Sequence, residues 1–242
     1  MNPMGQWFKQ LSGMVSSNNY AGQMSERDPA KIAYLRRLQK SMKQQDHLHI
    51  PFSDLTVVVF DIETTGFYPQ KGDRILSIGA TKVNGNKISE EEPFYSLINT
   101  TEPLSETVRD ITGITSKELI DAPPVEEVLM DFFKYINQHT LVAHHASHEK
   151  QFMQHASWSV FKTRFDYRIL DTSFLTKLIE PMSHLITLEE CCDYYEIDTT
   201  NRHHALHDAT MTAEMWCQCV DKIEELGFTC LKDVYAHLAS LR

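Results

Sequence analysis

The sequence predicts an α/β fold in which a mixed sheet is flanked by helices. Short apolar runs rich in β-branched residues stand at Thr56–Phe60 and Thr140–Ala143, a composition typical of buried strands. The pair Asn84-Gly85, a strong signal for a hairpin turn, separates two further strand-like runs. After Pro103 the apolar residues recur mainly at helical spacing. Together these patterns favour strands at the start of the domain and helices later.

The first strands are expected to form an antiparallel meander. Arg74–Val83 and Phe94–Ile98 read as strands on either side of the hairpin turn. No helical pattern separates them from the first buried run, so a βαβ unit is not expected there. Phe165–Leu170, which ends at Asp171, reads as a later strand.

Helices are predicted from periodicity and capping signals. Thr115 and Glu118 have the spacing of a capping box. Val125–Ile136 has helical periodicity, and a second helix is expected to follow Ala143 and run through Phe152. Further helices are expected at Thr187–Tyr195 and at Ala205–Leu226, the latter closed by Gly227.

The first 50 residues differ from the rest of the chain. An amphipathic stretch runs from Trp7 to Val15, and Pro29 opens a helix whose apolar stripe is Ile32, Leu35, Leu38 and Met42. We expect residues 1–50 to form a basic helical extension and residues 51–242 to form the catalytic domain. The extension has two interpretations: helices that pack on the main body, or a basic arm that docks nucleic acid or a partner.

The charge is unevenly distributed. Residues 1–50 hold seven Lys/Arg and three Asp/Glu, a net charge of +4. Residues 51–242 hold 16 Lys/Arg and 30 Asp/Glu, a net charge of −14. A protein that grips phosphates along a duplex usually shows a basic stripe, so a general nucleic-acid coat is disfavoured. An acidic body can still process nucleic acid if bound divalent cations supply positive charge at the reacting phosphate.

The composition favours a cytoplasmic protein that does not bind a membrane. The sequence has neither an apolar run of roughly 18 residues, as a membrane span needs, nor a signal-peptide pattern at its start. The five cysteines contain no CxxC pair, which favours reduced thiols.

Two carboxylates follow the first buried strand directly. Asp61 and Glu63 are spaced i and i+2, so they point the same way if the strand continues. Two like charges buried together are unfavourable unless a cation joins them, and hard oxygen ligands suit Mg²⁺ or Mn²⁺. The alternative is a turn at the strand end with solvated acids.

A second group of polar residues precedes the long C-terminal helix. Asp208 is expected in the first turns of that helix, and His203 stands just before it. A histidine five residues before a carboxylate indicates a mobile base beside a metal ligand. The alternative is that Asp208 is a capping charge that interacts favourably with the helix dipole.

These motifs together resemble the DnaQ-like, or DEDDh, family of 3′→5′ exonucleases, the family of the DNA polymerase III epsilon proofreading subunit. The family motif DxE[TS]TG is complete in Asp61–Gly66, and HxAxxD is complete in His203–Asp208. Between them, His144–Glu149 resembles the family's HNAxFD motif, and Leu170-Asp171-Thr172 matches a further landmark. The resemblance covers roughly residues 55–220.

The resemblance implies an RNase H-like fold and a two-metal mechanism with Mg²⁺ or Mn²⁺. Asp61 would bridge both ions, while Glu63 and Asp208 would hold the ion that binds the attacking water. His203 would accept the proton of that water, a role that suits histidine. The second ion would stabilise charge on the leaving 3′ oxygen. Asp171 is expected to be a structural hydrogen-bond acceptor and not a ligand.

The sequence departs from the family pattern at two places. Glu149 stands where the family's second motif has aspartate, so it either replaces that ligand from a longer arm or is a solvated helix residue. Thr112 stands where many relatives have histidine. Ile114, two residues later, either packs against the terminal base of the substrate or belongs to the hydrophobic core. The predicted substrate-binding residues are Ile62, Thr64, Thr65 and Ile114.

The sequence therefore predicts a 3′→5′ exonuclease that hydrolyses single-stranded nucleic acid, with DNA favoured, and releases nucleotide monophosphates. Its expected partners are single-stranded DNA or RNA 3′ ends and a polymerase or repair protein. Two alternatives stand beside this prediction. One is a catalytically weak relative that binds nucleic-acid ends or a partner protein, and the other is an RNA-trimming exoribonuclease of the same fold.

Overall fold

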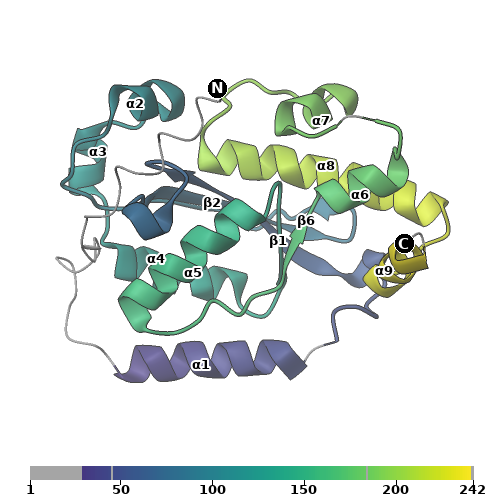
Figure 1. Ribbon diagram of the computed structural model, residues 1–242. Coiled ribbons are helices and arrows are strands. Elements are labelled where there is room, and N and C mark those ends of the chain that lie inside the picture. Colours follow the sequence, from purple (N-terminus) through teal and green to yellow (C-terminus); the bar gives the residue numbers. More distant parts are fainter. Residues whose placement is uncertain (1–28, 45, 184, 241–242) are drawn as a thin grey trace, which may run out of the picture.

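A computed structural model describes residues 29–44, 46–183 and 185–240 and contains a six-stranded mixed sheet (Figure 1). The strand order is β3-β2-β1-β5-β6, and β4 also pairs with β2. This sheet, flanked by helices, is RNase H-like and confirms the predicted fold class. The strands are β1 (Thr56–Thr64), β2 (Ile75–Asn84), β3 (Lys87–Ile88), β4 (Phe94–Leu97), β5 (Thr140–Ala143) and β6 (Ile169–Asp171).

The pairing directions follow the expected meander. β2 is antiparallel to β1, to β3 and to β4, whereas β5 is parallel to β1 and β6 is parallel to β5. Gly85 has a φ of 61° in the turn after β2, which suits glycine because this region penalises side chains. The hairpin partner of β2 is the two-residue β3, which the sequence analysis missed.

Two strand boundaries differ from the prediction. β1 continues through Thr64, four residues beyond the apolar run, because β2 pairs with it along that length. β6 begins only at Ile169, so the expectation of a strand from Phe165 was wrong. Its partner β5 has four residues and pairs with it at only three positions. Phe165 and Tyr167 are buried in the core without belonging to a strand.

Helices cover both faces of the sheet (Figure 1). The bounds of α4 match the prediction, and both halves of the Thr115/Glu118 capping box are present at α3. Helices α6 and α9 were not predicted. The helices are α1 (Pro29–Gln44), α2 (Glu106–Thr112), α3 (Ser116–Asp121), α4 (Val125–Ile136), α5 (Ser147–Phe161), α6 (Ser173–Ile179), α7 (Leu188–Tyr194), α8 (Ala205–Glu225) and α9 (Leu231–Ser240), with 3₁₀ turns η4 (Phe52–Asp54) and η5 (Pro69–Lys71).

The alternation of β1 divides the hydrophobic core into two main clusters. Val58, Phe60 and Ile62 pack in the cluster that contains α1, α4 and α5 side chains. Val57 and Val59 pack in the cluster that contains α7 and α8 side chains. Because successive strand residues point to opposite faces, the odd-numbered residues that follow on β1 face α8.

Helix α1 belongs to the packed body of the protein. Leu35 and Leu38 are 2% and 6% exposed and lie in the same cluster as the α4 side chains. Lys31 forms an ion pair with Glu126 of α4, with 2.7 Å between Nζ and Oε1. The predicted helix after residue 28 is therefore present. The predicted amphipathic stretch from Trp7 to Val15 lies outside the described residues.

In the described part of the chain, no helix combines the length and the apolar character needed to cross a membrane.

Candidate active site

The acidic residues of β1 lie at its C-terminal end, on the face that α8 covers. Because the strand continues through Thr64, Asp61 and Glu63 share one face. Their carboxylate oxygens and that of Asp208 from α8 all lie within 4.8 Å of one another. The structure therefore brings these three predicted residues together, although they come from two elements far apart in the chain.

Gly79 allows α8 to approach the sheet. It pairs with Asp61 across β1 and β2. A Cβ atom at this position would lie 2.2 Å from the backbone nitrogen of Leu206 and 2.3 Å from the carbonyl carbon of Ala205. Such distances are far shorter than van der Waals contact. The first turn of α8, which carries Asp208, can therefore rest on β2 only because residue 79 lacks a side chain.

Glu149 enters the site from the first turn of α5. Its side chain is buried, at 4% exposure, and its Oε2 atom has no hydrogen-bond partner. Its charge contributes to the raised pKa of Asp61, so the two carboxylates are close. It is outside the three-residue group whose oxygens lie within 4.8 Å. The structure thus places Glu149 beside the cluster, and a ligand role for it stays a prediction.

The loop before α5 is held by Asp171. Its carboxylate accepts hydrogen bonds from the backbone nitrogens of Ala146, at 3.1 Å, and Ser173, at 2.9 Å. This confirms the prediction that Asp171 is a structural acceptor. His144 is also engaged, with Nδ1 2.8 Å from the Thr172 hydroxyl and Nε2 2.9 Å from the Ile186 carbonyl oxygen. These contacts fix the start of α5 and therefore Glu149.

The crowded carboxylates are poorly stabilised as anions. Burial raises the pKa of Asp61 well above its usual range, and the three neighbouring carboxylates add to the effect. Burial, together with Asp208, raises the pKa of Glu63 to about 7. Burial raises the pKa of Glu149 to about 8, with a smaller contribution from Asp171. Burial and like charge are the two causes expected for acids packed together without a cation.

The donor set fits a divalent cation. Two buried carboxylate oxygens, Glu149 Oε2 and Asp208 Oδ1, have no hydrogen-bond partner in the described structure. Buried polar atoms are normally paired, so an unpaired carboxylate oxygen in an acidic cluster indicates a missing positive partner. Hard oxygen ligands of this kind suit Mg²⁺ or Mn²⁺.

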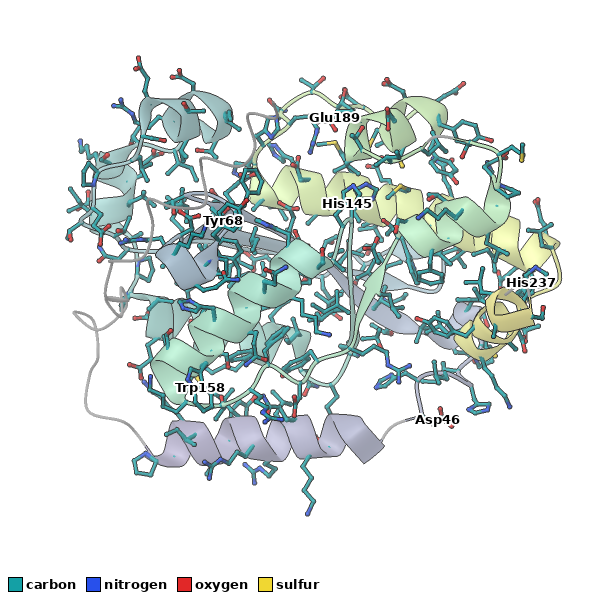
Figure 2. All side chains as sticks on the ribbon, viewed as in Figure 1. Asp46, Tyr68, His145, Trp158, Glu189 and His237 are labelled. Atoms are coloured by element: carbon teal, nitrogen blue, oxygen red, sulfur yellow. The ribbon has the colours of Figure 1, made fainter. Side chains whose placement is uncertain are left out.

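Arg202 is a site residue that the sequence analysis missed. Its Nη1 atom forms an ion pair with Asp208 Oδ2. Its Nε and Nη2 atoms lie 3.1 and 2.7 Å from Oε1 of Glu189 on α7, which Figure 2 labels. Arg202 therefore joins the acidic cluster to α7. No sequence motif marks it, because its partners meet only in the fold.

His203 lies on the turn between Arg202 and α8. It is exposed, and its φ of 63° is in the left-handed region, as is the φ of 70° at Asn201. Residues other than glycine in this region carry a strain on the order of 1–3 kcal/mol, and such strain is concentrated at functional sites. His203 therefore stands on a constrained, exposed turn just before the helix that carries Asp208, and its predicted role as base stays a prediction.

Two of the four predicted substrate-binding residues have buried side chains. Ile62 is 5% exposed and faces the α4 side of the sheet, away from the acids. Ile114 is 7% exposed and packs in a small cluster with Leu76 and Leu119. This packing favours a core role for both side chains, and their predicted contact with substrate stays a prediction. Strand alternation predicts the orientation of Ile62, because its neighbours Asp61 and Glu63 face the other side of the sheet.

The other two predicted substrate-binding residues close the loop after β1. The Thr64 hydroxyl donates to the Gly66 carbonyl oxygen at 2.7 Å. The Thr65 hydroxyl accepts from the Arg74 backbone nitrogen at 3.0 Å. Both side chains are partly exposed.

The fold and the acidic cluster together define a nuclease of the DEDDh type with an RNase H-like sheet. The family model RNase_T, described as exonuclease, matches residues 58–216. The chain therefore belongs to this exonuclease family.

The similar curated proteins are much longer than this chain. DNA polymerase III PolC-type from Bacillus cereus is 33% identical over 180 residues, which cover 74% of this chain and 12% of that protein. The Thermotoga maritima protein of the same name is 32% identical over 184 residues, which cover 76% of this chain and 13% of that protein. The chain thus spans about an eighth of the length of these relatives.

Solved structures share the fold at low sequence identity. Exonuclease X in complex with 5′-overhanging duplex DNA has a TM-score of 0.57 at 20% identity and covers 74% of this chain and 98% of that one. The nuclease domain of 3′hExo, a DEDDh family member bound to rAMP, has a TM-score of 0.60 at 16% identity, with coverages of 73% and 94%. E. coli exonuclease I with a dT13 oligonucleotide has a TM-score of 0.60 at 15% identity, with coverages of 72% and 42%.

Proposed function

We propose that this chain is a metal-dependent 3′→5′ exonuclease that hydrolyses single-stranded nucleic acid, with DNA favoured. The observation that carries the proposal is the convergence of oxygens from Asp61, Glu63 and Asp208 within 4.8 Å, with the buried carboxylate of Glu149 beside them. In an exonuclease family member, such a cluster at the end of the central strand is the expected place for phosphodiester hydrolysis.

The chain's own groups divide the work. Asp61, Glu63, Asp208 and Glu149 would hold two divalent cations, Mg²⁺ or Mn²⁺. When bound, these ions supply activation of the attacking water and neutralisation of charge at the leaving 3′ oxygen. An imidazole nitrogen of His203 takes the proton of the attacking water, a role supported by its exposure and its position on the turn just before the helix that carries Asp208. Thr64 and Thr65, which follow the acids of β1 and are partly exposed, would contact the terminal nucleotide.

DNA is the favoured substrate because the curated relatives at 31–33% identity are DNA polymerases. A polymerase or another repair protein is the corresponding partner. The second candidate is an RNA-trimming exoribonuclease, favoured by the similarity in fold to a domain bound to rAMP. A third, a weak catalyst that binds ends, is favoured by Glu149, because it lies outside the three-residue oxygen cluster.

The test uses the purified full chain and single-stranded DNA and RNA of the same sequence, labelled at the 5′ end. A 3′→5′ exonuclease gives a ladder of shortened labelled products with Mg²⁺ or Mn²⁺ and none with EDTA. Asp61→Asn is the matched inactive control. Immediate release of the labelled 5′ nucleotide would show that hydrolysis proceeds from the 5′ end. Absence of cleavage of both DNA and RNA would overturn the proposal.

We further propose that residues 51–242 carry the activity and that residues 1–50 form a functionally separate basic extension. All proposed ligands and His203 lie within residues 51–242. A variant that begins at Ile50 should hydrolyse short oligonucleotides but melt at a lower temperature, because Leu35 and Leu38 leave the core. A folded variant without activity at saturating substrate would show that the boundary is wrong.

A further inference from the structure

A groove lies between η5 and α5 and has a volume of about 310 Å³. Its wall on α5 is formed by one helical face, at positions 151, 154, 155 and 158, and the facing wall by η5. Trp158 is 52% exposed, an unusual exposure for so large an aromatic ring. The lining residues are Pro69, Gln70, Gln151, Gln154, His155 and Trp158.

The groove is joined to the candidate active site through both of its walls. On α5, His148, the neighbour of Glu149, shares one helix face with Gln151, His155 and Trp158, which follow it at i+3, i+7 and i+10. On the other side, η5 follows the loop that leaves β1 after Thr64, one residue beyond Glu63. At 1.5 Å of rise per residue, Trp158 is about 14 Å along the helix axis from Glu149. Figure 2 shows His145 near the start of α5 and Trp158 near its other end.

The loop that forms the second wall is braced. The Asp73 carboxylate accepts a hydrogen bond from the Tyr68 backbone nitrogen at 2.8 Å. A Cβ atom on Gly66 would lie 2.4 Å from the same carboxylate, so the loop folds back tightly on Asp73. Phe67, which follows, is 75% exposed, and its ring lies 5.9 Å from that of His148 on α5. The two walls therefore meet at the end of the groove nearer the acids.

The charge of this face suits a polyanion. None of the six lining residues is a carboxylate, although residues 51–242 carry a net charge of −14. An exposed lysine stands next to the lining residues on each of the two elements, Lys71 on η5 and Lys150 on α5. A nucleic-acid strand whose 3′ end reaches the acids must leave across the surface of this acidic body. Along the groove on α5, the phosphates of that strand would not lie beside a carboxylate of the groove lining.

We propose that this groove binds the single strand upstream of the scissile phosphodiester, with one base stacked on the indole of Trp158. The proposal rests on the proposed function and extends the same site. The side-chain amides of Gln70 and Gln151 are positioned to hydrogen-bond base edges. The Oε1 atom of Gln154 accepts a hydrogen bond from the Phe165 backbone nitrogen at 3.0 Å. This bond fixes the orientation of the Gln154 side-chain amide. Aromatic stacking tolerates any base, as a nuclease without sequence preference requires.

The experiment compares Trp158→Ala, Trp158→Phe and wild type on a dinucleotide and on a strand of about ten nucleotides, a length within the usual range of single-strand sites. Loss of a stacked base should raise KM for the longer strand between about 5- and 150-fold with kcat unchanged. Hydrolysis of the dinucleotide should not change, because it is too short to reach Trp158. Trp158→Phe should restore most of the affinity. Tyr235→Ala, a similarly exposed aromatic on α9, should change nothing.

A binding measurement without catalysis separates this inference from the proposed function. In EDTA, fluorescence anisotropy of the labelled longer strand should show the same loss of affinity for Trp158→Ala. A photoreactive base placed upstream of the 3′ end should crosslink to the α5 peptide that contains Trp158. If wild type binds the strand and Trp158→Ala binds it equally well, the groove is not its path. If wild type binds but cleaves neither DNA nor RNA, the proposed function fails while the binding result still decides the groove.

Discussion

The guanidinium group of Arg202 forms an ion pair with the carboxylate of Asp208, one of the three clustered acids. The same guanidinium is held on Glu189 of α7. Arg202 therefore places a permanent positive charge against a proposed metal ligand. It lowers the repulsion among the acids, since it opposes the rise in the pKa of both Asp61 and Glu63. It must also share Asp208 with any cation that binds.

We expect Arg202→Gln to bind divalent cations more tightly and to be less stable without them. Removing a positive charge beside Asp208 removes repulsion of the metal, and a change on the order of tenfold in Kd corresponds to only about 1.4 kcal/mol. In EDTA the melting temperature should fall, because the buried carboxylate loses its partner. Titration calorimetry with Mn²⁺ and thermal melting measure the two effects.

Glu189→Gln is the matched control for Arg202, because it loosens the guanidinium without removing its charge. It should change the metal affinity less than Arg202→Gln does. Weaker metal binding in Arg202→Gln would show that the guanidinium mainly orients Asp208 and does not compete with the metal.

We expect His203→Ala to lose most of the hydrolytic activity while its metal affinity is unchanged. Removal of a general base lowers kcat by roughly 10²–10⁴. His207→Ala is the control, since His207 is also exposed and lies at the start of the same helix. Turnover and Mn²⁺ titrations are measured for both variants. Wild-type turnover in His203→Ala near neutral pH would rule out this assignment.

We expect Gly79→Ala to weaken both folding and metal binding. The added Cβ would meet the α8 backbone at 2.2–2.4 Å and push Asp208 away from β1. Overpacking of this kind costs roughly 1–3 kcal/mol, and each kcal/mol lowers the melting temperature by about 2–4 °C in a chain of this size.

Gly113→Ala is the control for Gly79→Ala. A Cβ atom there meets nothing within 4 Å, but the φ of 69° makes alanine strained. It should lower stability without changing the affinity for Mn²⁺. Equal metal affinity in Gly79→Ala and wild type would mean that α8 can shift without carrying Asp208 away.

Much of this fold can be predicted from the sequence because apolar periodicity and capping residues act within single helices and strands. The bounds of β5 and α4 follow directly from their apolar patterns. Helix α6 escaped prediction because it has seven residues, its N-cap Thr172 makes no side-chain cap hydrogen bond, and its first turn has no acid. Helix α9 stands beyond Gly227, where a helix end had been inferred.

The candidate site was predictable where a motif is contiguous and not where the fold assembles it. Asp61 and Glu63 share a strand, so their common face follows from alternation. The contacts of Arg202 with Glu189, and of Gly79 with the start of α8, join segments far apart in the chain. Single-sequence periodicity carries no information on which such segments meet.

We expect the metal-free protein to become less stable as the pH rises from about 4.5 to 8. The pKa values of Glu63 and Glu149 are raised to about 7 and about 8, so the folded state keeps protons that the unfolded chain has released. When the folded state binds more protons, stability falls with rising pH, and below about 4.5 both states are protonated. Mn²⁺ should restore the melting temperature at the alkaline end.

Glu149→Gln is the control for this pH dependence, because an amide cannot titrate. Its melting temperature in EDTA should vary less over the same pH range than that of wild type. A flat profile for wild type, or an equal slope in both proteins, would contradict the ionisation of buried carboxyls as the cause.

Glu149 stands where the family motif has aspartate. Glu149 is buried with an unpaired oxygen, yet its carboxylate stays outside the group formed by Asp61, Glu63 and Asp208. If it is a ligand of the second ion, it would reach that ion with a side chain one methylene longer than aspartate. Glu149→Asp should then preserve or raise kcat. Glu149→Ala should lower kcat and raise the Mg²⁺ concentration needed for half-maximal rate.

Mn²⁺ sharpens the test of Glu149, because it accepts imperfect geometry more readily than Mg²⁺, which is strictly octahedral and slow to dehydrate. It should recover part of the activity of Glu149→Ala. Glu214→Ala provides the control, since Glu214 is an exposed glutamate further along α8. Metal titrations of wild type, Glu149→Asp and Glu149→Ala decide the question. Equal rates for Glu149→Ala and wild type at low Mg²⁺ would show that Glu149 is not a ligand. Loss of a ligand lowers the metal affinity, so it reduces the rate most at low metal concentration.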